Sequence, residues 1–390
     1  MQAYYFTEMP YPHYPEEAAK KLNSQRVILP SEYCDPEIAA DLYNRYLDEH
    51  EYADELGLNI MLNEHHQTPT CLDAAMPLSA AALIRRTKQA KILLLGNPIA
   101  HRDNPVRVAE EMSLLDCLSR GRLISGFVRG VPTEIHPANT NPVHTRERFE
   151  EAHDLIVKAW TERKPFNWEG RFWHYRYVNP WPRPYQQPHP PVWIPASSAE
   201  SIPWIAKHQY VHASFLLTYE EQEKLHKIYQ DTCAELGLPP AGADKFAHLA
   251  LVYVAETDEK AREEGEALMW YIRQIRHPGF NNPPGYLPPP VVARFFMPQN
   301  RPSPPSWEEL NDTGVVIWGN PQTVIEKIKY LHQRCQVGHL MMMMQAGFVS
   351  TELTRKSLKL FAQEVYPAIR ELGESETKQP AGRAGGAASS

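Results

Sequence analysis

The chain has 390 residues, of which 43% are hydrophobic and 22% are charged, and its formal net charge is -7. These values are typical of a globular protein, with enough length for one large α/β domain or two ordinary domains. The negative charge argues against a nucleic-acid surface, and no stretch approaches the roughly 20 apolar residues of a membrane span. The first residues lack the basic start and apolar core of a signal peptide, so we expect a cytoplasmic protein.

The five cysteines are scattered along the chain, and none forms a CxxC pair. An odd, unpaired set argues against a disulfide framework and against a zinc ribbon. We therefore expect a protein of a reduced compartment, without a metal site.

Apolar runs bounded by turn residues predict eight strands that alternate with helices. The helix starts are well marked, as at residues 35–37, where Asp35 predicts an N-cap and Pro36 the first helical position. The strands are expected at residues 3–9, 58–62, 91–95, 123–128, 192–194, 211–217, 248–255 and 339–345. Alternation of this kind predicts parallel strands with right-handed crossovers, and eight units fit an α/β fold of the closed (β/α)8 TIM barrel type.

Three segments interrupt the alternation. Residues 164–191, rich in aromatics and proline, predict a hairpin excursion after the fourth strand that turns at Glu169 and Gly170. Residues 277–307 carry ten prolines and predict a long lid after the seventh strand. Residues 374–390 form a Gly-, Ala- and Ser-rich tail that we expect to be disordered, so the barrel domain is predicted at residues 1–373.

Polar residues follow three successive strands, at residues 63–66 (NEHH), 96–98 (GNP) and 129–130 (RG). Ligand sites of such barrels lie where the strands give way to helices, so these groups are expected to share one site. A histidine there could act as a general base, because its pKa lies near the working pH. Adjacent strand residues point to opposite faces, so we expect His65 rather than His66 to face the pocket. The alternative is a hydrogen-bonded structural histidine.

Two further features predict a site for a ligand that carries a phosphate group and a flat ring. Arg129 offers a fork of donors for phosphate, and serines gather at the end of the fifth strand, where a helix begins. The alternative is a capped helix beside a surface arginine. Gly96 allows an unusual backbone angle and the bond before Pro98 can be cis, so the backbone could approach a flat ring closely. An ordinary turn is the alternative there. The serines are Ser197, Ser198 and Ser201.

Together these residues resemble the bacterial luciferase-like flavin-dependent monooxygenases. The resemblance is carried by residues 63–66 (NEHH), 96–123 (GNPIAHRDNPVRVAEEMSLLDCLSRGRL), 124–130 (ISGFVRG) and 191–201 (PVWIPASSAES). It runs from the first strand to about residue 372, and its central block is the most specific part. The resemblance implies a (β/α)8 barrel with insertions that binds reduced FMN, or a related deazaflavin, at the strand ends.

The resemblance also implies roles for single residues. His65 matches the family's base beside the flavin, and Gly96-Asn97 matches a non-proline cis peptide that bulges under the isoalloxazine ring. Two departures are Val128, where the light-emitting enzymes have a reactive cysteine, and Ser197, where the family has an acid. The first departure argues against a light-emitting aldehyde oxidase. The remaining cofactor positions fall on Arg129, Val131, Ser198 and Ser201.

The function that the resemblance implies is that of a two-component flavin monooxygenase. A separate flavin reductase would supply reduced FMN, because the sequence has no nicotinamide-binding fingerprint. With O2, a peroxyflavin would then oxygenate a bulky apolar organic substrate. Two alternatives stay open: an F420-dependent dehydrogenase or reductase on the same barrel, and a non-catalytic barrel that serves as a partner subunit. The resemblance further implies a homodimer packed through the helices near the second and third strands.

Overall fold

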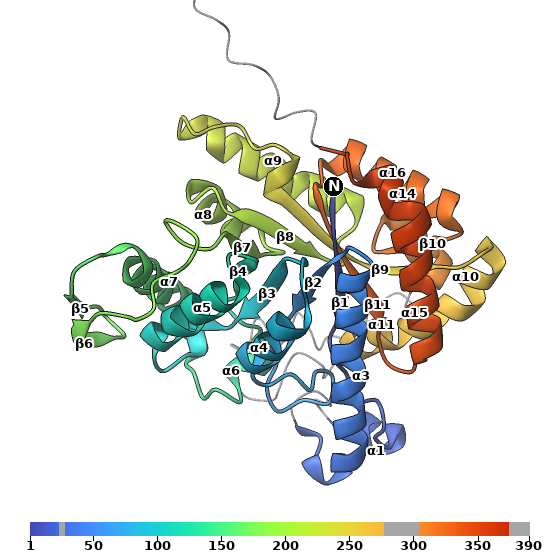
Figure 1. Ribbon diagram of the computed structural model, residues 1–390, viewed down its shortest axis with the longest axis horizontal. Coiled ribbons are helices and arrows are strands. Elements are labelled where there is room, and N and C mark those ends of the chain that lie inside the picture. The colour runs from blue at the N-terminus through green and yellow to red at the C-terminus, as the bar shows by residue number, and fades with distance from the viewer. Residues whose placement is uncertain (23–27, 277–304, 374–390) are drawn as a thin grey trace, which may run out of the picture.

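The computed structural model describes residues 1–22, 28–276 and 305–373. Its strands run through the centre of the molecule with helices around them (Figure 1). The main sheet has the order β10-β9-β11-β1-β2-β3-β4-β7-β8, and an additional pairing of β8 with β9 closes it into a parallel barrel. This confirms the predicted (β/α)8 fold. The strands of the closed ring are β1 (Gln2–Thr7), β2 (Asn59–Leu62), β3 (Ile92–Asn97), β4 (Leu123–Phe127), β7 (Val192–Pro195), β8 (Val211–Phe215), β9 (Phe246–Val254) and β11 (His339–Gln345).

One strand of the main sheet was not expected from the sequence. β10 (Val316–Gly319) pairs with the second half of β9, Leu251–Val254, whereas β8 pairs with the first half, Phe246–Leu249. β10 therefore continues the β9 ladder beyond β8. A buried run of four residues is too short to show the alternation of a strand in the sequence. β10 is therefore recognised as a strand only from its pairing with β9.

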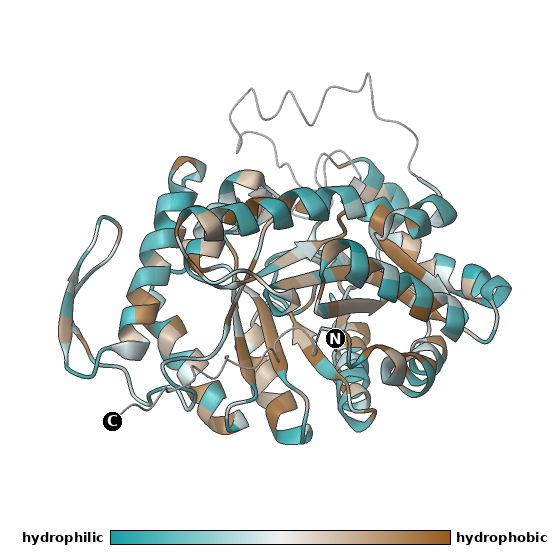
Figure 2. Cartoon of the chain, turned by 90° about the horizontal axis from the view of Figure 1, so that it is seen from above, coloured by the Kyte–Doolittle hydropathy of each residue, from teal (hydrophilic) through white to brown (hydrophobic). Residues whose placement is uncertain are grey.

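The helices surround the ring, and Figure 2 shows apolar colour concentrated on the strands and polar colour on the outer helices. The predicted helix start at Asp35 is confirmed, because its carboxylate accepts from the backbone N–H groups of Glu37 (2.8 Å) and Ile38 (3.4 Å). Within the described ranges, no helix combines the length and apolar character needed to cross a membrane. The helices are α1 (Glu16–Lys20), α3 (Pro36–Glu55), α4 (Met76–Arg86), α5 (Pro105–Ser119), α6 (Pro132–Ile135), α7 (Thr145–Thr161), α8 (Ile202–Lys207), α9 (Tyr219–Glu235), α10 (Asp258–Gly265), α11 (Met269–Arg276), α13 (Trp307–Thr313), α14 (Pro321–Cys335), α15 (Thr351–Leu360) and α16 (Tyr366–Ile369).

The predicted hairpin excursion is present as β5 (Phe166–Glu169) paired antiparallel with β6 (His174–Val178). In Figure 1 it stands apart from the barrel, beyond α7. The predicted lid falls almost entirely on residues 277–304, and the predicted tail on residues 374–390. Both lie outside the described residues.

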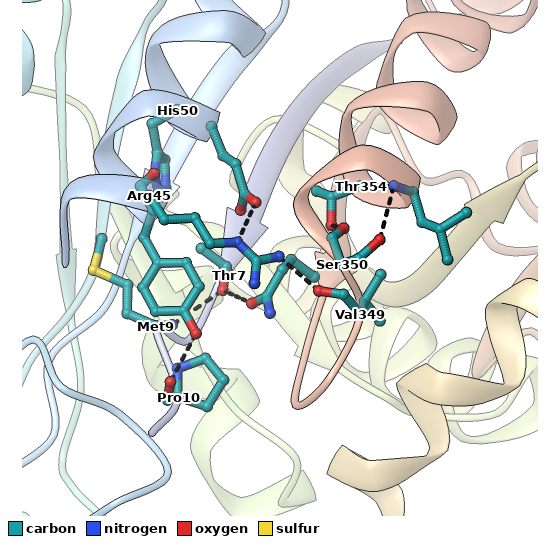
Figure 3. A network of polar contacts seen from close by, with 12 residues as sticks. Thr7, Met9, Pro10, Arg45, His50, Val349, Ser350 and Thr354 are labelled. Carbon is teal, nitrogen blue, oxygen red and sulfur yellow. Dashed lines mark hydrogen bonds and ion pairs between the residues drawn. The ribbon is translucent and has the colours of Figure 1, made fainter. Parts of the chain in front are cut away.

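A polar network joins the two ends of the chain where β1 meets β11 (Figure 3). Thr7 at the end of β1 donates to Gln345 at the end of β11, with 2.5 Å between the side-chain oxygens. Arg45 in α3 donates to the buried carboxylate of Glu49 (2.9 Å) and to the carbonyl oxygen of Val349 (2.6 Å). The first barrel helix is thereby fixed to the loop that follows the last strand.

Three buried histidines on the α9 side of the barrel make the fold sensitive to acid. Burial lowers the pKa of His212 and of His248 to about 4, and that of His226 to about 3, because a charged ring would lose its hydration. The folded chain therefore keeps these rings neutral at a pH where the unfolded chain, with an ordinary pKa near 6.5, takes up protons.

We expect the free energy of unfolding to fall as the pH drops from about 6.5 to about 4, since the unfolded state then binds more protons. Each such histidine contributes a slope of about 1.4 kcal/mol per pH unit. Urea unfolding at several pH values measures the slope. It should be shallower in His226→Gln and unchanged in His174→Gln, because His174 is exposed on β6. Equal slopes in all three proteins would contradict this account.

Candidate active site

The sheet order places four strand ends side by side. β2 pairs with β3, β3 with β4 and β4 with β7, all in parallel, so their carboxyl ends meet at one rim of the barrel. His65 follows β2, Gly96 lies near the end of β3, Arg129 follows β4 and Ser198 follows β7. The structure therefore brings the four groups of sequence-predicted site residues to the same end.

His65 is held by a carboxylate that the sequence analysis missed. Its Nδ1 lies 2.6 Å from Oε1 of Glu134 in α6, a residue only 4% exposed. A carboxylate at Nδ1 favours the tautomer with the proton on Nδ1, which leaves the Nε2 lone pair free to accept a proton. Glu134 comes four residues after Gly130, in the segment that follows β4. This nearness to a strand end was the signal in the sequence by which Glu134 could have been predicted as a site residue.

The neighbouring His66 has a different partner. Its Nε2 lies 2.8 Å from Oε1 of the buried Glu64, and this hydrogen bond raises the pKa of His66. Glu64 also accepts from the Arg102 guanidinium and from the backbone N–H of Met76 (3.1 Å). Arg102 in turn donates to Oδ1 of Asn97 (3.2 Å), so one carboxylate links the loops after β2 and β3.

A pocket of about 190 Å³ opens at this rim. This is below the roughly 300 Å³ of a typical cofactor site, so the pocket would be one part of a larger site. His66 lines the pocket, whereas His65 contacts only the lining residue Glu134, so the expectation that His65 rather than His66 faces inward is wrong for this pocket. The reason is that β2 ends at Leu62, so strand alternation does not extend to residue 65. The lining includes His66, Pro98, His101, Arg102 and Glu134.

The backbone at the end of β3 differs from the expectation. Among the described residues the cis peptide bonds precede Pro182 and Pro188, so the cis bond that the resemblance implies at Gly96-Asn97 is absent, and the bond before Pro98 is trans as well. Instead, the β3–β4 register shifts between Leu94 and Asn97. Glycine is needed here for space, because a Cβ on Gly96 would lie 1.9 Å from Cγ1 of Val128.

Asn97 offers a donor beside the pocket. Its side chain is fully buried, and its Nδ2 has no hydrogen-bond partner among the described residues. A buried amide donor without a partner is costly, so such a group is suited to a ligand acceptor.

Arg129 lies in a cationic corner of the same rim. Its side chain is exposed, yet partial burial and the nearby Arg146 lower its pKa, against the opposing effect of Glu200. Arg146, which the sequence analysis missed, approaches Glu200 to 3.4 Å. Guanidinium groups are well suited to binding a phosphate, so this corner could receive an anion beside Glu200.

The serines lie beside this corner. The hydroxyls of Ser198 and Ser201 are 3.0 Å apart across the short 3-10 turn Ala199–Ser201. Ser197 is exposed, and Val131 is 42% exposed. Arg129, Ser198 and Ser201 thus lie near one another at the position predicted for a phosphate, and the cofactor contacts predicted for Ser197 and for the backbone of Val131 stay predictions.

The fold and this rim define a (β/α)8 barrel protein with an acid/base pair and a cationic corner at the strand ends. A family model described as luciferase-like monooxygenase matches residues 30–335. The chain therefore belongs to the luciferase-like monooxygenase family, and it is a flavin-dependent oxidoreductase.

Known proteins agree with this placement. The limonene 1,2-monooxygenase of Rhodococcus erythropolis is 26% identical over 329 residues, which cover 81% of this chain and 79% of that protein. The oxygenating constituent of 3,6-diketocamphane monooxygenase from Pseudomonas putida, solved with FMN, superposes with a TM-score of 0.72 at 19% identity, covering 94% of this chain and 98% of that chain. An F420-dependent secondary alcohol dehydrogenase superposes with a TM-score of 0.65 at 15% identity, covering 84% and 95% of the two chains.

We expect Gly96→Ala to destabilise the protein by about 1–3 kcal/mol, because the added methyl group overlaps the Val128 side chain. In a Val128→Ala background, which removes both Cγ atoms, the same substitution should cost at least about 1 kcal/mol less. Urea unfolding of the four proteins measures this coupling. Additive losses would show that Val128 is not the obstacle.

Proposed function

We propose that the protein is the oxygenase of a two-component flavin monooxygenase, which uses reduced FMN and O2 to oxygenate a bulky apolar organic substrate. The observation that carries the proposal is the convergence of the His65–Glu134 pair and the Arg129 corner at one rim of the barrel. Membership of the luciferase-like monooxygenase family supports it.

The residues at the rim fit a flavin. Arg129, Ser198 and Ser201 would hold its phosphate, and the free Nδ2 donor of Asn97 suits an acceptor on the ring system. Because Gly96 has no side chain, the β3 backbone can lie close to Val128, which follows β4. When bound, the reduced flavin supplies the electrons that activate O2, and the protein supplies position and exclusion of water.

His65 moves protons at this site. The hydrogen bond from its Nδ1 to Glu134 orients the ring and leaves Nε2 to take a proton from a reacting oxygen, or to return one. Glu134 is a positioning residue, because it acts through the imidazole. His66 is committed to Glu64 and holds the loop.

Three finer parts of the proposal are the separate reductase, the apolar substrate and the homodimer. The first two are supported by relatives, and the third by exposed side chains. The solved relative described as the oxygenating constituent of its enzyme supports a separate reductase that delivers FMNH2. The limonene enzyme supports the apolar character of the proposed substrate. Exposed leucines on α4 and α5, the helices beside β2 and β3, suit a homodimer; they are Leu78 (73% exposed), Leu114 (49%) and Leu118 (42%).

The alternative cofactor is F420. The structural likeness to an F420-dependent secondary alcohol dehydrogenase favours it as the second candidate, since that relative is described as binding F420 and the diketocamphane enzyme of the same fold as binding FMN. In that reaction a hydride moves and O2 is not consumed. A barrel that serves only as a partner subunit would bind neither cofactor.

Flavin binding followed by oxygen consumption distinguishes these functions. We expect the protein to bind FMNH2 with micromolar or tighter affinity and to consume O2 with a terpene or ketone of similar size when a flavin reductase and NADH are present. Stopped-flow spectra measure binding, and an oxygen electrode with product analysis by mass spectrometry measures turnover. F420 reduction without O2 uptake would favour the dehydrogenase, and no flavin binding would favour the partner subunit.

We expect His65→Gln to lower kcat by about 10²- to 10⁴-fold and to leave FMNH2 affinity within a few-fold, because the proton acceptor is lost and the phosphate corner is kept. Glu134→Gln should lower kcat less, and the double variant should be no slower than His65→Gln, because Glu134 acts through His65. Steady-state kinetics of the four proteins test this. Multiplicative losses would mean that the two residues act independently.

A further inference from the structure

A second cluster of titratable groups lies between α7 and α8, on the outside of the barrel. His153 and Asp154 are neighbours in α7, and His208 directly follows α8. One ligand atom from each lies within 4.8 Å of the others. Within residues 1–22, 28–276 and 305–373, no other trio of His, Cys, Asp or Glu side chains gathers this closely. None of the three belongs to the proposed flavin site.

The hydrogen bonds of both rings suit a metal. Nδ1 of His208 donates to the carbonyl oxygen of Trp204 (2.8 Å), which leaves the Nε2 lone pair available. His153 approaches Asp154 through Nδ1 (2.9 Å) and the Tyr210 hydroxyl through Nε2 (2.8 Å). If Nδ1 binds a metal, Nε2–H donates to the Tyr210 oxygen. Metal-binding histidines are commonly held in this way, by a second hydrogen bond on the other nitrogen.

The cluster of His153, Asp154 and His208 is buried on the His153 side and exposed to solvent on the Asp154 side. The side chain of His153 is 3% exposed and packs edge-on against Trp204, with ring centroids 4.8 Å apart. The side chain of Asp154 is 63% exposed, so an ion can enter from solvent and the carboxylate can rotate towards it.

We propose that His153, Asp154 and His208 bind one Zn²⁺ ion. Two imidazoles and one carboxylate are a donor set for zinc and similar divalent transition metals, whereas Mg²⁺ and Ca²⁺ prefer oxygen alone. Tetrahedral zinc with ligands at 2.0–2.1 Å needs donor atoms about 3.3 Å apart, and a water molecule would complete the four ligands here. The exposed Asp154 side chain and the terminal position of His208 allow this approach.

The ion would fasten two helices that a surface ion pair already joins. Arg146 in the first turn of α7 meets Glu200, which precedes α8, at 3.4 Å. The histidine cluster connects the same two helices further along, at the end of α8. The zinc role is therefore structural: it holds α7 against α8, and no bond is made or broken.

The test uses the full-length protein stripped with a chelator and titrated with ZnCl2 by calorimetry at neutral pH. We expect one Zn²⁺ per chain from the wild type and a rise in its melting temperature on zinc addition. Asp154→Asn and His208→Gln should each weaken zinc binding by more than about tenfold and abolish that rise. His174→Gln is the matched control, because it removes an exposed histidine outside the cluster and should change neither value.

Two outcomes would overturn the proposal. One is the absence of zinc binding by the wild type at concentrations up to about 0.1 mM. The other is equal zinc affinity in the wild type, Asp154→Asn and His208→Gln. The metal-free variants should melt at the temperature of the metal-free wild type. This control shows that weaker zinc binding does not come from misfolding. Replacement by Co²⁺ adds a direct readout, because a visible spectrum that is present in the wild type and absent in the variants reports the ligands.

Discussion

The parallel pairing of β2, β3, β4 and β7 is the constraint on which the rest of the site depends. Parallel strands all end at one rim, so residues that lie far apart in the chain meet there without any further specification. The close approach of β3 to β4 requires glycine at position 96, since Val128 occupies the space that a side chain would need. The same contact gives a structural role to Val128.

Two buried carboxylates give the adjacent histidines different tasks. A carboxylate removed from water is costly unless it is hydrogen-bonded, and Glu64 meets this cost with His66, Arg102 and the Met76 N–H. Glu134 receives the other histidine, His65. One ring thereby holds loops together, whereas Nε2 of the other makes no hydrogen bond among the described residues. Neighbours in sequence thus have separate chemistry, because their partners come from different loops.

The α7–α8 side of the barrel connects this chemistry with stability. Arg146 belongs to α7 and lies near Arg129, while Ser198 and Ser201 lie just before α8. The cationic corner proposed for a phosphate is therefore built on segments whose relative position depends on contacts between these two helices. The histidine cluster further along α7 is placed to control that position from outside the active site.

The sequence by itself determined the barrel, the hairpin excursion and the rim where the site lies, because strand periodicity, helix caps such as Asp35 and residues that follow strands are local signals. It also indicated His65, Gly96, Asn97, Arg129 and the serines as site residues. Only the tertiary structure decided the partners, since Glu134, Arg146 and the cluster that joins His208 to His153 depend on contacts between distant segments. It also replaced the expected cis peptide with a register shift and added β10, because backbone geometry at a strand end and a four-residue strand are both set by the neighbouring strand.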